Sequence, residues 1–275
     1  MTPGPARQRK IRSAFRILEA ALGEQHWWPA GSAFEVIVGA YLTQNTAWTN
    51  VERAIDNLRH AGALSIDGIR STPVEELEQL IRPAGYFRQK AARLKRFIEH
   101  LDAGYSGSLG ALFARPAEEL RDELLSLNGI GPETADSILL YAACKEVFVV
   151  DAYTRRIFER HALATPATPY DEIRISVEQA LDAEEVHFEK REREGSIAVH
   201  RRCKDDSGSS ANHAVPGLAI HLPSAASRLP RSELARRYNE FHALLVQTAK
   251  HFCLKKEARC EHCPLRPLLP RTSRP

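Results

Sequence analysis

The sequence predicts an all-α protein, and three observations support that fold class. Apolar residues recur at helical spacing along most of the 275 residues, helix-start signals precede several of these stripes, and strand patterns are almost absent. The one β-like run, Phe148-Val149-Val150, is too short and isolated to build a sheet. With 43% hydrophobic and 27% charged residues, the chain has the composition of a water-soluble globular protein with one large or two ordinary domains.

The helical signals follow one another along the chain. An amphipathic stripe over residues 11–22 predicts the first helix. Ser32 and Glu35 form a capping box that opens an apolar segment over residues 34–42. Thr72-Pro73-Val74-Glu75 supplies a cap, a first-turn proline and a box glutamate for a later helix. Apolar stripes mark the other predicted helices at residues 51–58, 94–101, 120–127, 138–142, 173–181 and 234–245.

Hydropathy and cysteine usage restrict the cellular environment in which the protein is expected to work. A mean hydropathy of -0.35, without an apolar run of about twenty residues, excludes a membrane-spanning segment. Five cysteines are too few for a disulfide scaffold, and three of them stand close together near the C-terminus, as metal ligands do. We therefore expect an intracellular protein in a reducing compartment, in the cytoplasm or nucleoid if the source is bacterial. As a separate expectation, the protein is a monomer.

The helical period is lost between residues 186 and 228, where serine, glycine, proline, histidine and charged residues dominate. Structureless loops of about forty residues are rare inside compact domains, which favours a disordered insert over this range. Because the helical pattern resumes at Leu234, the insert is expected to interrupt a domain.

The charge pattern gives a limited indication of a partner. A net charge of +3 is weak evidence for nucleic-acid binding, but basic residues cluster at 7–12, 88–96 and 155–160, the last cluster including Arg155. A solvated helix face is the alternative interpretation of each cluster.

Residues 127–136, Leu-Asn-Gly-Ile-Gly-Pro-Glu-Thr-Ala-Asp, form a tight turn between two predicted helices. Gly129 and Gly131 allow backbone amides to approach a phosphate, and the helix that starts before Thr134 adds unpaired N-terminal amides. Such a turn holds a DNA backbone without reading its sequence. An ordinary corner between two helices is the alternative.

Asp151 stands where the apolar segment 148–150 enters the next predicted helix, about twenty residues after Gly131. A helix cap is the usual explanation for an aspartate at such a position. In combination with the hairpin, however, this residue resembles the catalytic aspartate of the endonuclease III superfamily of DNA glycosylases. The signature of that superfamily is a helix-hairpin-helix followed by a Gly/Pro-rich loop and an aspartate after valine.

The resemblance covers most of the chain outside the insert, and it implies that the partner is double-stranded DNA carrying a damaged base. Gln44, within Leu42-Thr43-Gln44-Asn45-Thr46, matches the family glutamine that enters the gap left by a flipped base. Tyr86 matches the position that wedges between bases on the opposite strand, with core packing as the alternative. Together with the hairpin and the basic clusters, this gives six predicted DNA-binding residues: Gln44, Tyr86, Gly129, Gly131, Thr134 and Arg155.

Residues 27–29, 43–48 and 82–85 resemble the 3-methyladenine DNA glycosylase III branch, which removes alkylated purines. An aromatic pocket suits such a target, because stacking and cation–π attraction hold a flipped, positively charged base. The candidates for this pocket are Trp27, Trp28 and Trp48, with ordinary packing as the alternative.

Near the C-terminus, Cys253, Cys260 and Cys263 match in spacing the first three ligands of the family's iron–sulfur loop. Leu269 stands where the fourth cysteine is expected, although a [4Fe-4S] cluster normally takes four thiolates. We interpret the segment as a cluster-type loop, with zinc or no metal as the alternatives. The candidates for a further ligand are Cys203, His251 and His262.

The resemblance also implies two helical lobes with DNA lying across the cleft between them. Residues 33–141 would form a central lobe that ends in the hairpin, and residues 1–32, 142–185 and 229–275 the second lobe with the Cys-rich loop.

The implied reaction is hydrolysis of a base–sugar bond, in which Asp151 stabilises positive charge on the sugar and helps to activate water. Lyase members of the family carry a lysine two residues after the second hairpin glycine. Glu133 occupies that position, which predicts a monofunctional enzyme. A bifunctional glycosylase and abasic-site lyase, or a DNA-binding homologue without catalysis, are the alternatives.

Overall fold

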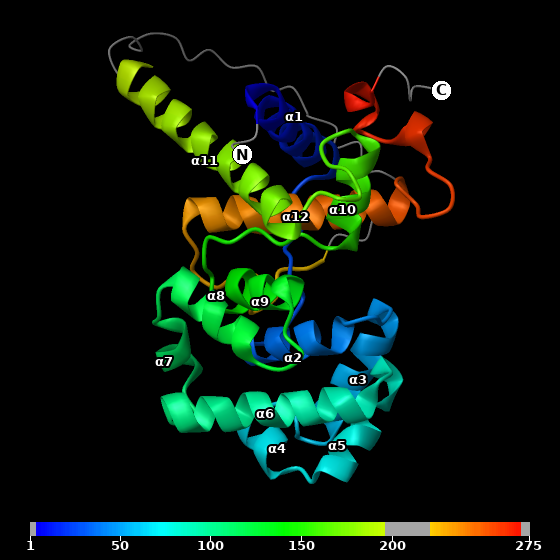
Figure 1. Cartoon of the computed structure of the whole chain (residues 1–275), viewed down its shortest axis with the longest axis vertical. Helices are drawn as coiled ribbons and strands as arrows, with labels where there is room; N and C mark the ends of the chain where they lie inside the picture. Colours follow the sequence, from blue (N-terminus) through cyan, green and yellow to red (C-terminus); the bar gives the residue numbers. More distant parts are fainter. Residues whose placement is uncertain (1–3, 196–220, 271–275) are drawn as a thin grey trace, which may run out of the picture. The chain divides into compact units, whose positions relative to one another are not determined.

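The computed structural model describes residues 4–195 and 221–270, and every regular element in those residues is a helix (Figure 1). The predicted all-α fold is therefore confirmed. None of the helices in this part of the chain combines the length and apolar character that crossing a bilayer requires. The chain forms two compact units. We call His26–Val149 with His221–Ala235 the hairpin unit, and Met1–Gln25 with Val150–Ile220 and Arg236–Pro275 the aspartate unit.

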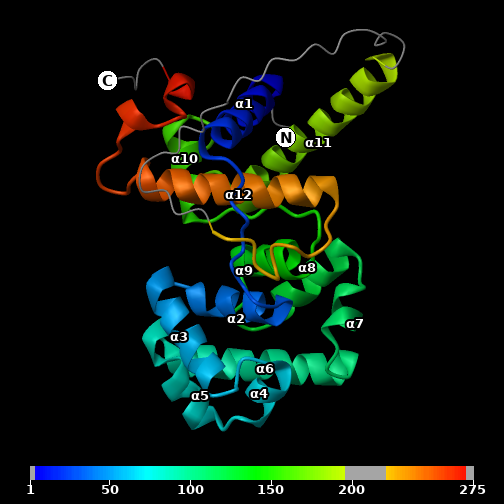
Figure 2. The same ribbon diagram turned by 180° about the vertical axis from the view of Figure 1, so that it is seen from behind.

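The hairpin unit is built around α2, whose residues from Phe34 to Leu42 are all buried. Helices α3 and α6 and the π-helical turn η2 pack on α2, and α4 and α5 pack on α6 (Figure 2). The elements of this unit are α2 (Ala33–Thr43), α3 (Trp48–His60), α4 (Ile66–Ser71), α5 (Val74–Leu80), η1 (Arg82–Ala84), α6 (Phe87–Tyr105), α7 (Leu109–Phe113), α8 (Ala117–Ser126), α9 (Pro132–Ser137) and η2 (Ile138–Ala142).

The start of α2 follows the predicted capping box. Ser32 Oγ accepts a hydrogen bond from the Glu35 amide at 3.1 Å, which satisfies one of the free N–H groups at the helix start. The Glu35 carboxylate bonds the amide of Gly31 at 3.2 Å, one residue before the cap. The Glu35 side chain of the capping box therefore bonds Gly31, the residue just before the cap.

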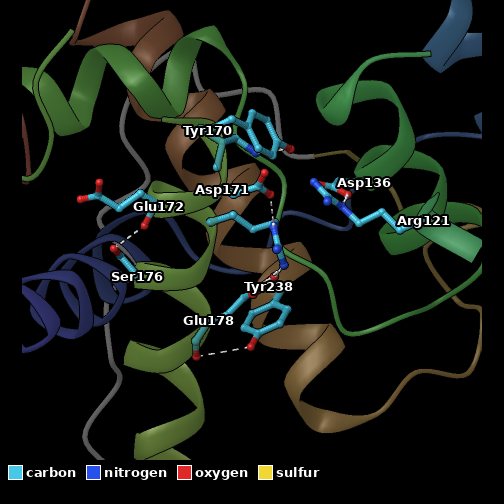
Figure 3. A network of polar contacts seen from close by, with 10 residues as sticks. Arg121, Asp136, Tyr170, Asp171, Glu172, Ser176, Glu178 and Tyr238 are labelled. Atoms are coloured by element: carbon cyan, nitrogen blue, oxygen red, sulfur yellow. Dashed lines mark hydrogen bonds and ion pairs between the residues drawn. The ribbon is translucent and has the colours of Figure 1, made fainter. Parts of the chain in front are cut away.

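The aspartate unit contains α1 (Pro5–Leu22), α10 (Ala152–Arg160), α11 (Tyr170–Gly195), η3 (Cys260–His262), η4 (Arg266–Leu268) and, from Arg236 onward, α12 (Glu233–His251). Helix α1 packs along α11, and the ring of Phe15 meets that of Phe241 edge-on at 5.4 Å. The Tyr238 hydroxyl donates to the Glu178 carbonyl oxygen at 3.3 Å, which joins α12 to α11 (Figure 3).

The insert predicted over residues 186–228 differs from the structure at both ends. Helix α11 continues to Gly195, because residues 186–195 are rich in Glu, Lys and Arg, which favour helix without an apolar stripe. Beyond the insert, the Ala226 amide donates to Ala30 O at 3.0 Å and Ser224 Oγ donates to Trp28 O at 2.8 Å. These bonds attach the returning chain to the hairpin unit. Residues 196–220 lie outside the described residues.

The predicted lobe of residues 33–141 lies within the hairpin unit. That unit also includes residues 26–32, 142–149 and 221–235.

Candidate active site and nucleic-acid interface

Asp151 is the N-cap of α10, and its two carboxylate oxygens have different partners. Oδ1 accepts a hydrogen bond from the Thr154 amide at 2.7 Å, as a capping aspartate does. Oδ2 lies 3.6 Å from Nε2 of His242, which comes from α12. The side chains of Asp151 and His242 are 13% and 5% exposed. The cap therefore uses one oxygen, and the other faces an imidazole.

The surroundings of Asp151 favour its ionised form. Burial raises the pKa of this carboxyl, but the nearby imidazole of His242 and the hydrogen bond from Thr154 together lower the pKa by more, so the net shift is downward. The positive potential at the N-terminal end of α10 also favours the charged form of Asp151. Asp151 is therefore a carboxylate at neutral pH, in a site with little solvent.

The segment around Asp151 is fixed by contacts within the aspartate unit. The Val150 amide donates to the Tyr170 hydroxyl at 3.2 Å, so the residue before the aspartate is held by the start of α11. Arg155, one of the predicted DNA-binding residues, donates through Nη1 to the Thr168 carbonyl oxygen at 2.9 Å. Its guanidinium thus orders the loop that precedes α11.

The predicted hairpin lies between α8 and α9 in the hairpin unit. Gly129 has φ +89°, a left-handed conformation that glycine adopts without strain, and a side chain there would meet the guanidinium of Arg93. Gly131 is the N-cap of α9 and is exposed, with open space around the position of a Cβ atom. Arg121 holds the buried Asp136 of α9 through two bonds of 2.7 and 3.2 Å (Figure 3).

Gln44 lies against this hairpin, 85 residues away in sequence. Its Nε2 donates to Gly129 O at 2.8 Å and to Thr134 Oγ1 at 3.0 Å, and its Oε1 accepts from Arg93 Nη1 at 2.8 Å. The structure thus brings together three of the predicted DNA-binding residues. The contribution of Arg93 was not predicted, although it belongs to the basic cluster at 88–96.

Tyr86 is 67% exposed, which removes core packing as the explanation for this residue. It precedes α6 with φ 45°, a conformation uncommon for a residue other than glycine. The next residue, Phe87, is half-buried and stacks beneath the guanidinium groups of Arg82 and Arg88, whose carbons lie 5.7 and 5.5 Å from the ring centroid. An exposed aromatic side chain therefore projects from a basic loop.

The three tryptophans form one aromatic cluster. The ring centroids lie 5.6 Å apart for Trp27 and Trp28, 5.3 Å for Trp28 and Trp48, and 6.4 Å for Trp27 and Trp48. Tyr141 and His221 extend the cluster at 5.2 Å from Trp28 and 5.3 Å from Trp27. Trp27 and Trp28 are each 6% exposed, whereas Trp48 is half-buried and bonds Glu52 through its indole N–H.

The C-terminal cysteines do not fit a four-thiolate cluster as they are arranged. Cys253 Sγ lies 3.1 Å from Arg160 Nη1, and Leu269, at the position of the missing ligand, is buried. The pKa of the Cys263 thiol is raised to about 11, mainly by burial. The other two cysteines also raise this pKa, and a hydrogen bond from the Leu265 amide lowers it. Among the side chains that the structure describes, no three of His, Cys, Asp or Glu are grouped as metal ligands.

Two arginines of α10 hold the start of this cysteine loop. Arg156 Nε donates to Cys253 O at 2.7 Å, and Arg160 Nη1 donates to Leu254 O at 2.8 Å. His262 is largely exposed, and Cys203 lies outside the described residues. Backbone contacts to arginine therefore organise the loop in this structure.

Comparison with known proteins identifies the family. The profile of the HhH-GPD superfamily of base excision DNA repair proteins matches residues 38–182, more than half of the chain. The chain belongs to this superfamily.

Individual relatives agree over nearly the whole chain. MJ1434 of Methanocaldococcus jannaschii, which carries the assignment DNA repair glycosylase, is 38% identical over 257 residues, covering 93% of this chain and 94% of that protein. The crystal structure of H. pylori 3-methyladenine DNA glycosylase (MagIII) bound to 1,N6-ethenoadenine is 25% identical, with a TM-score of 0.62 over 89% of this chain and 97% of that one. A non-covalent endonuclease III–DNA complex has a TM-score of 0.65 at 17% identity, over 95% and 94% of the two chains, and supports the fold alone.

Proposed function

We propose that this protein is a monofunctional DNA glycosylase that hydrolyses the bond between a damaged base and its sugar in duplex DNA. The observation that carries the proposal is the ionised Asp151 at the start of α10, in a chain of the HhH-GPD superfamily. As the base leaves, positive charge builds on the sugar. A carboxylate stabilises that charge and helps to orient or deprotonate the attacking water.

His242 would keep Asp151 ready for this role. By opposing the effect of burial, the imidazole holds the carboxyl in its charged form and orients Oδ2. Since the Thr154 amide occupies Oδ1, the carboxylate cannot rotate freely. A charge that is placed before the reaction starts does not need to reorganise during it.

The hairpin unit would bind the DNA. The exposed Gly131 allows phosphate to approach the amides at the start of α9. Gln44 would fill the gap that the flipped base leaves in the stack, and Tyr86 would insert between bases on the opposite strand. A base has to leave the stack before a carboxylate reaches its sugar bond, so these residues would act before the chemical step.

The choice of an alkylated purine rests on the aromatic cluster and on similarity to a 3-methyladenine glycosylase. Half-buried Trp48 offers ring surface for stacking on an electron-poor base, and the buried rings of Trp27 and Trp28 pack behind it in the same cluster. The described cysteines are free thiols, as in a protein that works in a reducing compartment.

The proposal is tested by incubating the protein with duplexes that carry 3-methyladenine, 1,N6-ethenoadenine, thymine glycol or uracil, analysed with and without alkali. We expect release of an alkylated adenine and strand breaks only after alkali. Breaks without alkali would indicate a lyase. DNA binding without release of any base would indicate a homologue that lacks catalysis.

A further inference from the structure

Lys90 is a lysine buried inside the hairpin unit, with 1% of its surface exposed. Lysine is almost never buried to this extent unless its charge has partners. Three acceptors surround its ammonium group: Leu42 O at 2.8 Å, Thr46 Oγ1 at 2.7 Å and Ala84 O at 2.8 Å. An ammonium has three N–H donors, so each of them has one acceptor.

These acceptors belong to two separate segments. Leu42 and Thr46 stand two residues before and two residues after Gln44, at the end of α2, and Ala84 stands two residues before Tyr86. Thr46 Oγ1 also lies 2.5 Å from Ala84 O, so the two segments meet at the ammonium. The chain around Gln44 and the chain around Tyr86 are therefore attached to one buried cation.

We infer that Lys90 is a positioning residue, which fixes the Gln44 segment and the Tyr86 segment relative to each other for insertion into DNA. The inference rests on the proposed function, since it takes these two side chains as the ones that enter the base stack. Two side chains that act on one base pair have to be held to within roughly 0.5 Å of the productive geometry. Both lie on loops, and loops do not supply that precision without such a tie.

A second residue of α6, Arg93, about one helical turn after Lys90, also contacts the loop that carries Gln44. Arg93 Nη1 donates to Gln44 Oε1 at 2.8 Å, so Lys90 holds the backbone on either side of Gln44 and Arg93 holds its side chain. Burial, followed by the charge of Arg93, lowers the pKa of Lys90 to about 8. The ammonium form that uses all three donors therefore predominates at pH 7.

The test compares Lys90→Met with Lys95→Met in the full-length protein. Lys95 lies on the same helix, and its ammonium likewise bonds three oxygens, those of Ile69, Arg70 and Thr72 at the end of α4. Neither Gln44 nor Tyr86 lies in that segment. Amide hydrogen exchange is measured for residues 43–47, 84–88 and 66–72. Base release is measured on a damaged duplex and on the same damaged strand without its complement.

For Lys90→Met we expect exchange to accelerate about tenfold or more in both 43–47 and 84–88, since a buried charged hydrogen-bond donor is lost. For Lys95→Met we expect acceleration over 66–72 only. Lys90→Met should reduce base release from duplex by about tenfold while largely sparing the single strand, where no base pair has to be opened. Wild-type protection of both loops in Lys90→Met, or equal losses on duplex and single strand, would overturn the inference.

A milder variant covers the case in which Lys90→Met does not fold. Thr46→Val removes one acceptor and the Thr46–Ala84 contact, and should loosen both loops to a smaller extent. Unchanged exchange in this variant counts against the inference. If the wild-type protein releases no base from any duplex, the proposed glycosylase activity fails, and the exchange data still decide whether Lys90 ties the two loops.

Discussion

Nε2 of His242 lies 3.6 Å from Oδ2 of Asp151, and little of either side chain is exposed to solvent. Burial alone would favour a protonated, neutral carboxyl. The imidazole and the Thr154 amide reverse that preference, and the pKa of Asp151 is lowered on balance. A buried carboxylate that remains charged is suited to stabilise positive charge on a substrate.

Replacing Asp151 with asparagine should reduce base release by about 10²-fold or more, because a preorganised charge is lost from the site. Asparagine is as good an N-cap as aspartate, so the fold should be preserved. Single-turnover base release and DNA-binding anisotropy measure the two effects. The matched control is Asp171→Asn, which changes a half-exposed carboxylate at the start of α11. Comparable losses in both variants would show that activity depends on the overall charge of the protein and not on Asp151 in particular.

The pH dependence should change when His242 is replaced with leucine. Without the imidazole, burial dominates, so the pKa of Asp151 rises and the acid limb of kcat/KM moves to higher pH. Base release measured from pH 4 to 8 checks the shift, with the exposed His60→Leu as control. An unchanged acid limb would mean that His242 does not influence the reacting carboxylate.

Acid stability follows from the same lowered pKa. The folded pKa of Asp151 lies below its unfolded value of about 3.9, so its stabilising contribution is present above that value and is lost as the pH falls through the folded pKa. Thermal melting of the wild type from pH 7 to 2 should therefore lose this contribution only below about pH 4. In His242→Leu, where burial dominates and the folded pKa of Asp151 lies above its unfolded value, this loss should disappear, and protonation of Asp151 should instead add stability as the pH falls through that raised pKa.

Gly131→Val tests phosphate binding by the hairpin with little cost to the fold. The φ of Gly131 is -99° and the space beside it is open, so valine fits, but its branches would shield the amides at the start of α9. Affinity for damaged and undamaged duplexes should fall together. The wild-type salt dependence should follow a slope of about -0.9 per neutralised phosphate. If only damaged-base affinity falls, the hairpin does not hold the backbone.

The local features of this fold could be predicted from the sequence, whereas most long-range contacts could not. The Ser32 cap, the all-α class and the turn at Gly129 depend on neighbouring residues, whose spacing is visible in the chain. His242 lies 91 residues after Asp151 on a helix recognised only by its apolar stripe, so no local pattern marks it as a site residue. Likewise, in the sequence Lys90 and Arg93 are simply members of a basic cluster. Only the packing of α6 shows that Lys90 bonds a backbone oxygen and that Arg93 bonds the amide oxygen of Gln44.

Metal analysis of protein purified without oxygen tests the arrangement of the cysteine loop. Because Leu269 is buried at the fourth position and Arg160 contacts Cys253, we expect no stoichiometric iron–sulfur cluster. Arg160→Met should lower Tm more than Cys260→Ser, since it removes bonds to the backbone of the loop. Iron and sulfide in equal amounts would contradict this expectation and restore the cluster-type loop, and stoichiometric zinc would support a site of three cysteines and a histidine.

The reaction type depends on Glu133, which is exposed in the first turn of α9, two residues after Gly131. A carboxylate cannot form an imine with an opened sugar, so borohydride should trap no covalent complex between the wild-type protein and damaged DNA. Glu133→Lys places an amine at the position where lyase members of the family carry one, and should produce trapping together with strand breaks that need no alkali. The control is Glu118→Lys on α8, which adds the same charge away from the hairpin turn. Efficient trapping by the wild type would show that another amine attacks the sugar, and the monofunctional assignment would then be wrong.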